Sequence, residues 1–100
     1  MPLEIRQSAA AREDLIEIWL YIDTYNTMAA NRILDRIEQL AIRLAEQPEM
    51  GRLALDSDRR LRVFPIEGYS VFYRASDTEL TIVRVLSHYR DATAQSFPET

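Results

Sequence analysis

The chain contains no cysteine and no lysine, and His88 is the only histidine among its 100 residues. The absence of cysteine excludes disulfide bridges, thiolate zinc sites and cysteine nucleophiles. A single histidine excludes a histidine-rich metal site, so we expect neither a metal nor a cofactor. Proton transfer near neutral pH is also restricted, because arginine, the other basic residue type present, stays protonated.

Long apolar runs are absent as well. No stretch approaches the roughly 18 residues of a membrane-spanning helix, and residues 1–6 lack the uncharged apolar core of a secretion signal. We therefore expect neither membrane insertion nor export, and we expect a cytoplasmic protein. The 47% apolar and 28% charged residues fit a single soluble domain over residues 1–100.

The charge balance argues against a protein that binds duplex DNA directly. The net charge is −4 and the isoelectric point is near 4.9, whereas holding duplex nucleic acid requires a basic face. All 12 basic residues are arginines, and five of them lie close together in the second half: Arg52, Arg59, Arg60, Arg62 and Arg74. Arginine suits bidentate binding of carboxylate or phosphate. The composition bias of a GC-rich genome is an equally simple explanation.

The first half of the chain predicts a short strand followed by two helices. Leu3 to Arg6 alternates apolar and polar residues, as in a strand, and Ser8 is placed as a helix N-cap. Residues 9–25 and 28–47 carry apolar side chains at helical spacing. Pro48 ends the second helix, because proline cannot donate to the helical hydrogen-bond pattern.

The second half predicts a small sheet. Three β-rich runs, residues 60–66, 69–75 and 80–87, follow a polar connector at residues 53–58. Short turns between the runs predict an antiparallel meander. The order β-α-α-β-β-β indicates an α+β fold, in which a helical hairpin packs on one face of a mostly antiparallel sheet and leaves the other face free to bind. For residues 92–100 we expect a short helix or disorder.

The first predicted helix is apolar on more than one face. Its core stripe includes Ile18 and Trp19, and we expect Trp19 to anchor the core. Ile16 and Leu20 form a second apolar pair about a third of a turn away. An exposed pair of this kind suits a partner's amphipathic segment, or a second copy of the chain.

Arg84 is the arginine for which we expect a structural role. It shares a strand face with apolar neighbours such as Ile82 and Leu86. A guanidinium group in such surroundings requires a carboxylate partner. We therefore expect an ion pair with Asp91 or with Asp14 inside the fold.

An ordered set of segments extends over most of the chain. It consists of Asp14 to Ile22 with its Asp-Leu, Ile-Trp and Tyr-Ile pairs, Pro48 to Arg52, Leu61 to Phe64, Gly68-Tyr69, and Arg84 to Leu86. Together these segments resemble the RelE/ParE toxin superfamily, and within it the ParE-type toxins known from plasmid stabilisation systems. The resemblance covers residues 3–91 and implies the same fold that the pattern predicts.

The resemblance also implies a bacterial type II toxin–antitoxin system and a ParD-like antitoxin as partner, in a heterotetramer or beside a toxin homodimer. ParE-type members poison DNA gyrase and are not known to use catalytic residues. RelE-type members cleave messenger RNA in the ribosome, with basic residues on the free sheet face and a late tyrosine or histidine. A third hypothesis is a degenerate toxin that only binds antitoxin and co-represses its operon.

Absent residues favour the ParE type. Leu61, Val63 and Ser70 stand where RelE-type proteins have basic residues, and Ser96 or Phe97 stands near the place of the late tyrosine. In one segment the chain departs from the ParE type itself: residues 87–91 read Ser-His-Tyr-Arg-Asp, where ParE-type toxins frequently have His-Gly-Arg-Arg-Asp. We therefore predict gyrase inhibition by protein binding with no catalytic residue, and we keep a ribosome-dependent endoribonuclease as the alternative.

Three sets of side chains are the candidate sites. A nuclease would use His88, Tyr89 and Arg90 as base, acid and cation; otherwise His88 is structural or faces a partner. The residues expected to bind antitoxin are Ile16, Leu20, Arg59, Arg60 and Arg62, the arginines through carboxylate forks unless they only make a strand edge soluble. The residues expected to bind the target are Arg62, Arg74 and Arg90.

Overall fold

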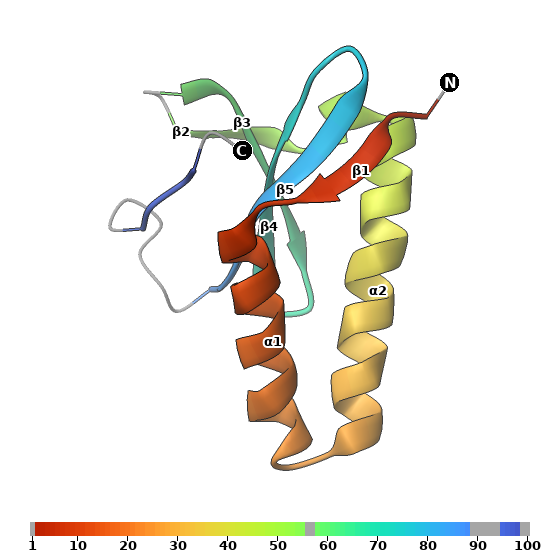
Figure 1. Ribbon diagram of the computed structural model, residues 1–100, viewed down its shortest axis with the longest axis vertical. Helices are drawn as coiled ribbons and strands as arrows, with labels where there is room; N and C mark the ends of the chain where they lie inside the picture. The colour runs from red at the N-terminus through yellow and green to blue at the C-terminus, as the bar shows by residue number, and fades with distance from the viewer. Residues whose placement is uncertain (1, 56–57, 89–94, 99–100) are drawn as a thin grey trace.

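The computed structural model describes residues 2–55, 58–88 and 95–98 (Figure 1). For residues 55, 58 and 59 it describes the backbone only. The elements in chain order are β1 (Glu4–Gln7), α1 (Ala9–Asp23), α2 (Thr27–Glu46), the 3-10 turn η1 (Pro48–Met50), β2 (Arg52–Leu55), β3 (Asp58–Ile66), β4 (Tyr69–Ala75) and β5 (Glu79–Ser87).

The described strands form a five-stranded sheet in the order β1-β5-β4-β3-β2. β1 pairs with β5 in parallel, and the other neighbours are antiparallel. The predicted meander of three strands is therefore confirmed, and so is the α+β fold. The turn between β3 and β4 uses positive φ at both Glu67 (48°) and Gly68 (87°), as a tight hairpin requires.

Both helices begin at side-chain caps. The Ser8 Oγ accepts from the Ala11 N–H (3.0 Å), and the Asn26 Oδ1 accepts from the Ala29 N–H (3.1 Å). These bonds satisfy backbone donors that have no partner inside the helix. Neither α1 nor α2 is long and apolar enough to cross a membrane.

The prediction of a polar connector at residues 53–58 is wrong, because β2 occupies its first part. Arg52 pairs with Val63, and Leu53 pairs with Arg62, at the edge of the sheet. The register shifts between Leu53 and Leu55. β2 exists because β3 offers it a free edge for hydrogen bonding, which local periodicity does not reveal.

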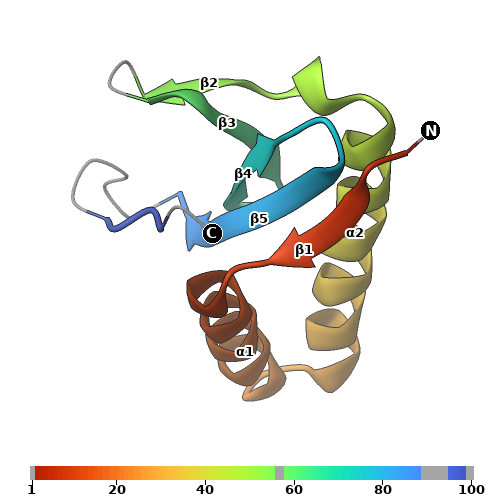
Figure 2. The ribbon, with the colours of Figure 1, turned by 45° about the horizontal axis from the view of Figure 1, so that its top comes forward.

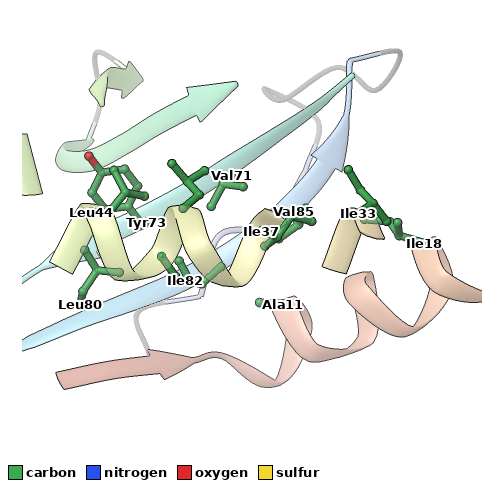
Figure 3. Close-up of a cluster of buried hydrophobic side chains, with 12 residues drawn as sticks. Ala11, Ile18, Ile33, Ile37, Leu44, Val71, Tyr73, Leu80, Ile82 and Val85 are labelled. Carbon is green, nitrogen blue, oxygen red and sulfur yellow. The ribbon is translucent and has the colours of Figure 1, made fainter. Parts of the chain in front are cut away.

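The main core lies between the helical hairpin and one face of the sheet (Figures 2 and 3). Its fully buried side chains on the sheet include Val71, Tyr73, Leu80 and Ile82. α2 contributes the stripe that its sequence predicts: Ala30, Ile33, Ile37, Leu40, Ala41, Leu44 and Ala45 are buried, and Leu34 is partly buried. This packing fixes α1 and α2 against the sheet.

A second, smaller core lies on the opposite face of the sheet. Its buried side chains are Leu61, Val63, Phe72, Val83 and Leu86. Phe97 packs on it, with its ring centroid 4.9 Å from that of Phe72. Residues 95–98 form neither helix nor strand, and they cover part of the face that the sequence predicted to be open.

Candidate functional site

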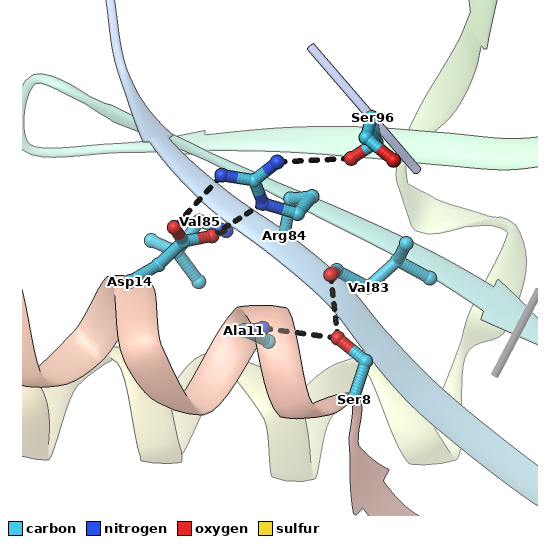
Figure 4. A network of polar contacts seen from close by, with 7 residues as sticks. All are labelled: Ser8, Ala11, Asp14, Val83, Arg84, Val85 and Ser96. Carbon is cyan, nitrogen blue, oxygen red and sulfur yellow. Dashed lines mark hydrogen bonds and ion pairs between the residues drawn. The ribbon is translucent and has the colours of Figure 1, made fainter. Parts of the chain in front are cut away.

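A buried ion pair joins α1 to β5 (Figure 4). The Arg84 Nε donates to the Asp14 Oδ2 (2.7 Å), and the Arg84 Nη2 donates to the Asp14 Oδ1 (2.9 Å). The Val85 N–H also donates to the Asp14 Oδ2 (3.0 Å). The side chains of Arg84 and Asp14 are only 12% and 6% exposed. The predicted internal pair is thus confirmed with Asp14 as the partner.

This pair is part of a larger polar network at the start of α1. The Ser8 Oγ, besides capping the helix, donates to the Val83 carbonyl oxygen (2.7 Å). The hydrogen bonds that Arg84 donates to Asp14 raise the pKa of Arg84, and burial opposes that shift. Arg84 therefore stays cationic, and its ion pair with Asp14 has a structural role.

Two arginines hold the C-terminal segment against the sheet. The Arg84 Nη1 donates to the Ser96 carbonyl oxygen (2.9 Å), and the Arg74 Nη1 donates to the Pro98 carbonyl oxygen. Between these contacts, Phe97 packs on the second core. Sequence reasoning did not find this arrangement, although an aromatic residue next to proline at the end of the chain was a usable signal.

The candidate target-binding arginines do not form one surface among the described residues. Arg62 lies with Gly51 and Tyr73, on the side of the helices. Arg74 contacts Pro98 beside the second core, on the opposite side. Arg90 lies outside the described residues. Arg62 pairs across the strands with Tyr73 and so shares its face, whereas Arg74 is the next residue after Tyr73 on β4. Successive residues of a strand point to opposite faces, so the two arginines are separated.

His88 is exposed at the end of β5 and is tied to the β3–β4 turn. Its backbone N–H donates to the Gly68 carbonyl oxygen (3.0 Å), and its Nε2 lies 3.0 Å from the Tyr69 carbonyl oxygen. A carbonyl oxygen can only accept, so this second contact requires a proton on Nε2. Tyr89 and Arg90, the other members of the alternative nuclease site, lie outside the described residues.

Tyr73 is buried and locked between two backbone groups. Its hydroxyl donates to the Pro48 carbonyl oxygen (2.6 Å) and accepts from the Gly51 N–H (2.9 Å). Burial raises the pKa of Tyr73, partly offset by the Gly51 hydrogen bond and the charge of Arg62. The phenol therefore stays neutral and has a structural role.

The outer side of α1 carries the predicted exposed apolar pair. Ile16 is 59% exposed and Leu20 is 56% exposed. They line a shallow apolar hollow together with Leu15, Trp19 and Leu34. Trp19 is partly buried and its Nε1–H donates to the Asn31 Oδ1 (2.9 Å). The expectation that Trp19 anchors the core is thus wrong: the indole bridges the two helices beside the exposed pair.

Arg60 and Arg62 line a polar hollow of about 770 Å³. Its other walls are residues 47–50, at the end of α2 and in η1, and residues 75–77, at the end of β4. The side chain of Arg59 lies outside the description. Among the described residues, no group of three or more metal-ligating side chains is close enough to hold a metal ion.

The comparison with known families decides the identity of this fold. A family model described as the ParE toxin of the type II toxin–antitoxin system parDE matches residues 5–92. The chain belongs to the ParE toxin family. It is therefore a toxin of a type II toxin–antitoxin system, in the RelE/ParE superfamily that its segments resemble.

Two curated relatives of this ParE-family toxin come from Caulobacter vibrioides. Toxin RelE2 is 40% identical over 75 residues, which are 75% of this chain and 83% of that protein. Toxin ParE3 is 33% identical over 66 residues, which are 66% of each chain. The two names belong to the two branches of the superfamily, so they do not choose between gyrase and RNA as the target.

Solved structures share the fold of this ParE-family toxin. A chain of the chromosomal ParDE system from P. aeruginosa has a TM-score of 0.69 at 18% identity, covering 85% of this chain and 95% of that one. A chain of the RelBE2 toxin–antitoxin complex from Mycobacterium tuberculosis has a TM-score of 0.69 at 23% identity, covering 88% and 100%. Two helices on a mostly antiparallel sheet are common to all three.

Proposed function

We propose that this ParE-family toxin inhibits DNA gyrase in the cytoplasm by protein binding, without a catalytic site, and that a ParD-like antitoxin neutralises it. The observation that supports this proposal is the occupation of the sheet face opposite the helices. That face carries the second core, with Phe97 packed on it. An RNA-cleaving member of the superfamily would be expected to use this face for its substrate.

The chemistry of that face argues in the same direction. RNA cleavage by the 2′-hydroxyl needs a base, an acid and a cation that stabilises the charged phosphorane. The described residues of the second core are apolar, and the two arginines beside it bind backbone carbonyl oxygens of residues 96 and 98. Arg84 is also held by Asp14. These contacts favour docking over cleavage.

The proposed antitoxin site is the exposed apolar pair on α1. Ile16 and Leu20 stand beside Trp19, which together with Leu34 forms a shallow apolar hollow. An amphipathic segment can place apolar side chains in such a hollow at helical spacing. The charged residues Arg60 and Arg62 lie elsewhere, at the hollow under η1, so we propose a second contact of the partner there.

A direct assay separates the two targets. Purified toxin, gyrase and supercoiled plasmid are expected to give linear DNA or lost supercoiling, and His88→Ala is expected to leave this effect unchanged. Primer extension on messages translated in vitro is expected to show no cuts at codon positions. Ribosome-dependent cuts that disappear in His88→Ala, with gyrase unaffected, would contradict the proposal and support the ribonuclease hypothesis.

Replacing both Ile16 and Leu20 by glutamate is expected to weaken antitoxin binding about 100-fold or more. Burial of each apolar side chain is worth about 1.5 to 3 kcal/mol, and a buried carboxylate adds an unfavourable term. Calorimetry with the cognate antitoxin measures the change. Unfolding by urea is expected to be nearly unchanged, because both positions are exposed in the free toxin.

Met28→Glu is the matched control for this double variant. Met28 is the most exposed large apolar residue of the described helices, at 82%, and it lies at the start of α2. Its replacement is expected to change antitoxin affinity less than twofold. Equal losses in Met28→Glu and in the double variant would show that added charge, and not the apolar pair, controls binding.

A further inference from the structure

The hollow beneath η1 contains an arginine that the fold holds in one orientation. Arg62, on β3, lines this hollow, and its Nη1 donates to the Gly51 carbonyl oxygen (2.7 Å). Gly51 is itself fixed, because its N–H donates to the Tyr73 Oη (2.9 Å). Tyr73 is fully buried and donates onward to the Pro48 carbonyl oxygen (2.6 Å). The guanidinium group is thus preorganised by a chain of hydrogen bonds.

The remaining donors of Arg62 have no partner among the described residues. Its Nη1 makes the hydrogen bond to Gly51, and within the described part of the chain no carboxylate lies within 4.0 Å of its guanidinium nitrogens. The Nε and Nη2 donors are not fully buried, so a ligand can reach them. Together these two atoms form the planar edge of a guanidinium that fits the two oxygens of a carboxylate.

We propose that this hollow is a carboxylate-binding site, in which the Nε and Nη2 of Arg62 hold an acidic side chain of a protein partner. The inference deepens the proposed function, because it names the chemistry that a partner must present at this site. Arg62 differs here from an ordinary surface arginine: its orientation is determined before binding, so less side-chain entropy is lost when the carboxylate arrives.

The walls of the hollow favour a carboxylate over a phosphate group. Glu49 and Asp77 line it, and the C-terminal end of α2 contributes a partial negative charge. These features repel a doubly charged phosphate more than a singly charged carboxylate. Phosphate sites in proteins commonly combine several donors at a helix N-terminus, whereas this hollow lies at a helix C-terminus.

The test uses the isolated chain and small probes, with nuclear magnetic resonance of the arginine Nε–H groups and of the Gly51 amide. Acetyl-glutamate methylamide is expected to cause saturable shifts at Arg62 and Gly51, and acetyl-glutamine methylamide is expected to cause none. Inorganic phosphate is expected to bind more weakly than the glutamate probe. Tighter binding of phosphate, or equal responses to the two amino-acid probes, would overturn the proposal.

Two lysine variants assign the site to one residue. Arg62→Lys keeps the charge but removes the planar fork, and is expected to weaken binding of the glutamate probe about tenfold. Arg32→Lys, an exposed arginine of α2 outside the hollow, is expected to change it less than twofold. Wild-type affinity in Arg62→Lys would overturn the assignment. The probe titration of the unmodified chain decides the proposal even if Arg62→Lys does not fold.

Failure of the carboxylate-site proposal and failure of the gyrase proposal would give different experimental results. The probe titration contains neither gyrase nor antitoxin, so a carboxylate site at Arg62 is measured whether or not gyrase is the target. With the cognate antitoxin as the partner, Arg62→Lys is expected to weaken the complex about tenfold, and unchanged affinity would exclude the antitoxin as the source of the carboxylate.

Discussion

Replacing Asp14 by alanine is expected to lower the free energy of unfolding by about 3 to 5 kcal/mol. The substitution leaves the Arg84 guanidinium buried without its carboxylate and leaves the Val85 N–H without its acceptor. Desolvation of an uncompensated charge is the main cost. Urea unfolding followed by circular dichroism measures the change, and we expect the C-terminal segment to lose protection in hydrogen exchange because Arg84 also holds Ser96.

Glu13→Ala is the matched control, because Glu13 is an exposed acid one residue earlier in α1. Its loss is expected to cost less than about 0.5 kcal/mol. The double variant Asp14→Leu with Arg84→Met is expected to recover part of the stability, since it removes both buried charges. If Asp14→Ala costs no more than Glu13→Ala, the buried pair does not stabilise the fold.

Replacing Gly51 by alanine is expected to lower the free energy of unfolding by about 3 kcal/mol or more. An added Cβ would lie 2.5 Å from the Tyr73 Oη, 2.8 Å from its Cε1 and 2.9 Å from the Val63 carbonyl oxygen. The ring cannot retreat easily, because Tyr73 is fully buried and bonded to Pro48. Thermal and urea unfolding measure the loss.

Gly68→Ala separates crowding from backbone conformation. Gly68 has φ of 87° but nothing within 4 Å of an added Cβ, so its replacement is expected to cost about 1 kcal/mol through strain alone. Gly51 has an extended backbone that alanine readily adopts. A Gly51→Ala protein that is as stable as Gly68→Ala would mean that the Tyr73 contact yields without cost.

Local pattern was sufficient where one element repeats a strong period. The apolar spacing of residues 28–47 predicts α2 within one residue at each end, because burial against a single surface selects a 3.6-residue repeat. The runs that become β3, β4 and β5 were predicted for a similar reason, together with the turn at Glu67-Gly68. β2 was missed, since its pairing with β3 and not its own composition makes it a strand.

The candidate sites were less predictable than the fold. The exposure of Ile16 and Leu20 follows from a second apolar pair on a helix whose other face already fills the core. The role of Phe97 does not follow from local pattern, because Phe72, its aromatic contact, lies in a different strand. Trp19 was predicted to lie in the core, but its indole N–H donates to Asn31, so the side chain lies at the rim of the core.

The residues themselves determined the family, the order of helices and strands, the absence of thiol chemistry and the need of Arg84 for a carboxylate. The tertiary structure decided that Asp14 is that carboxylate, 70 positions away in sequence. It also decided that residues 96–98 lie over the second core and that Tyr73 orients Gly51 and Arg62. Periodicity indicates only on which side of its own helix or strand a residue lies. These contacts depend on how elements distant in sequence pack against one another.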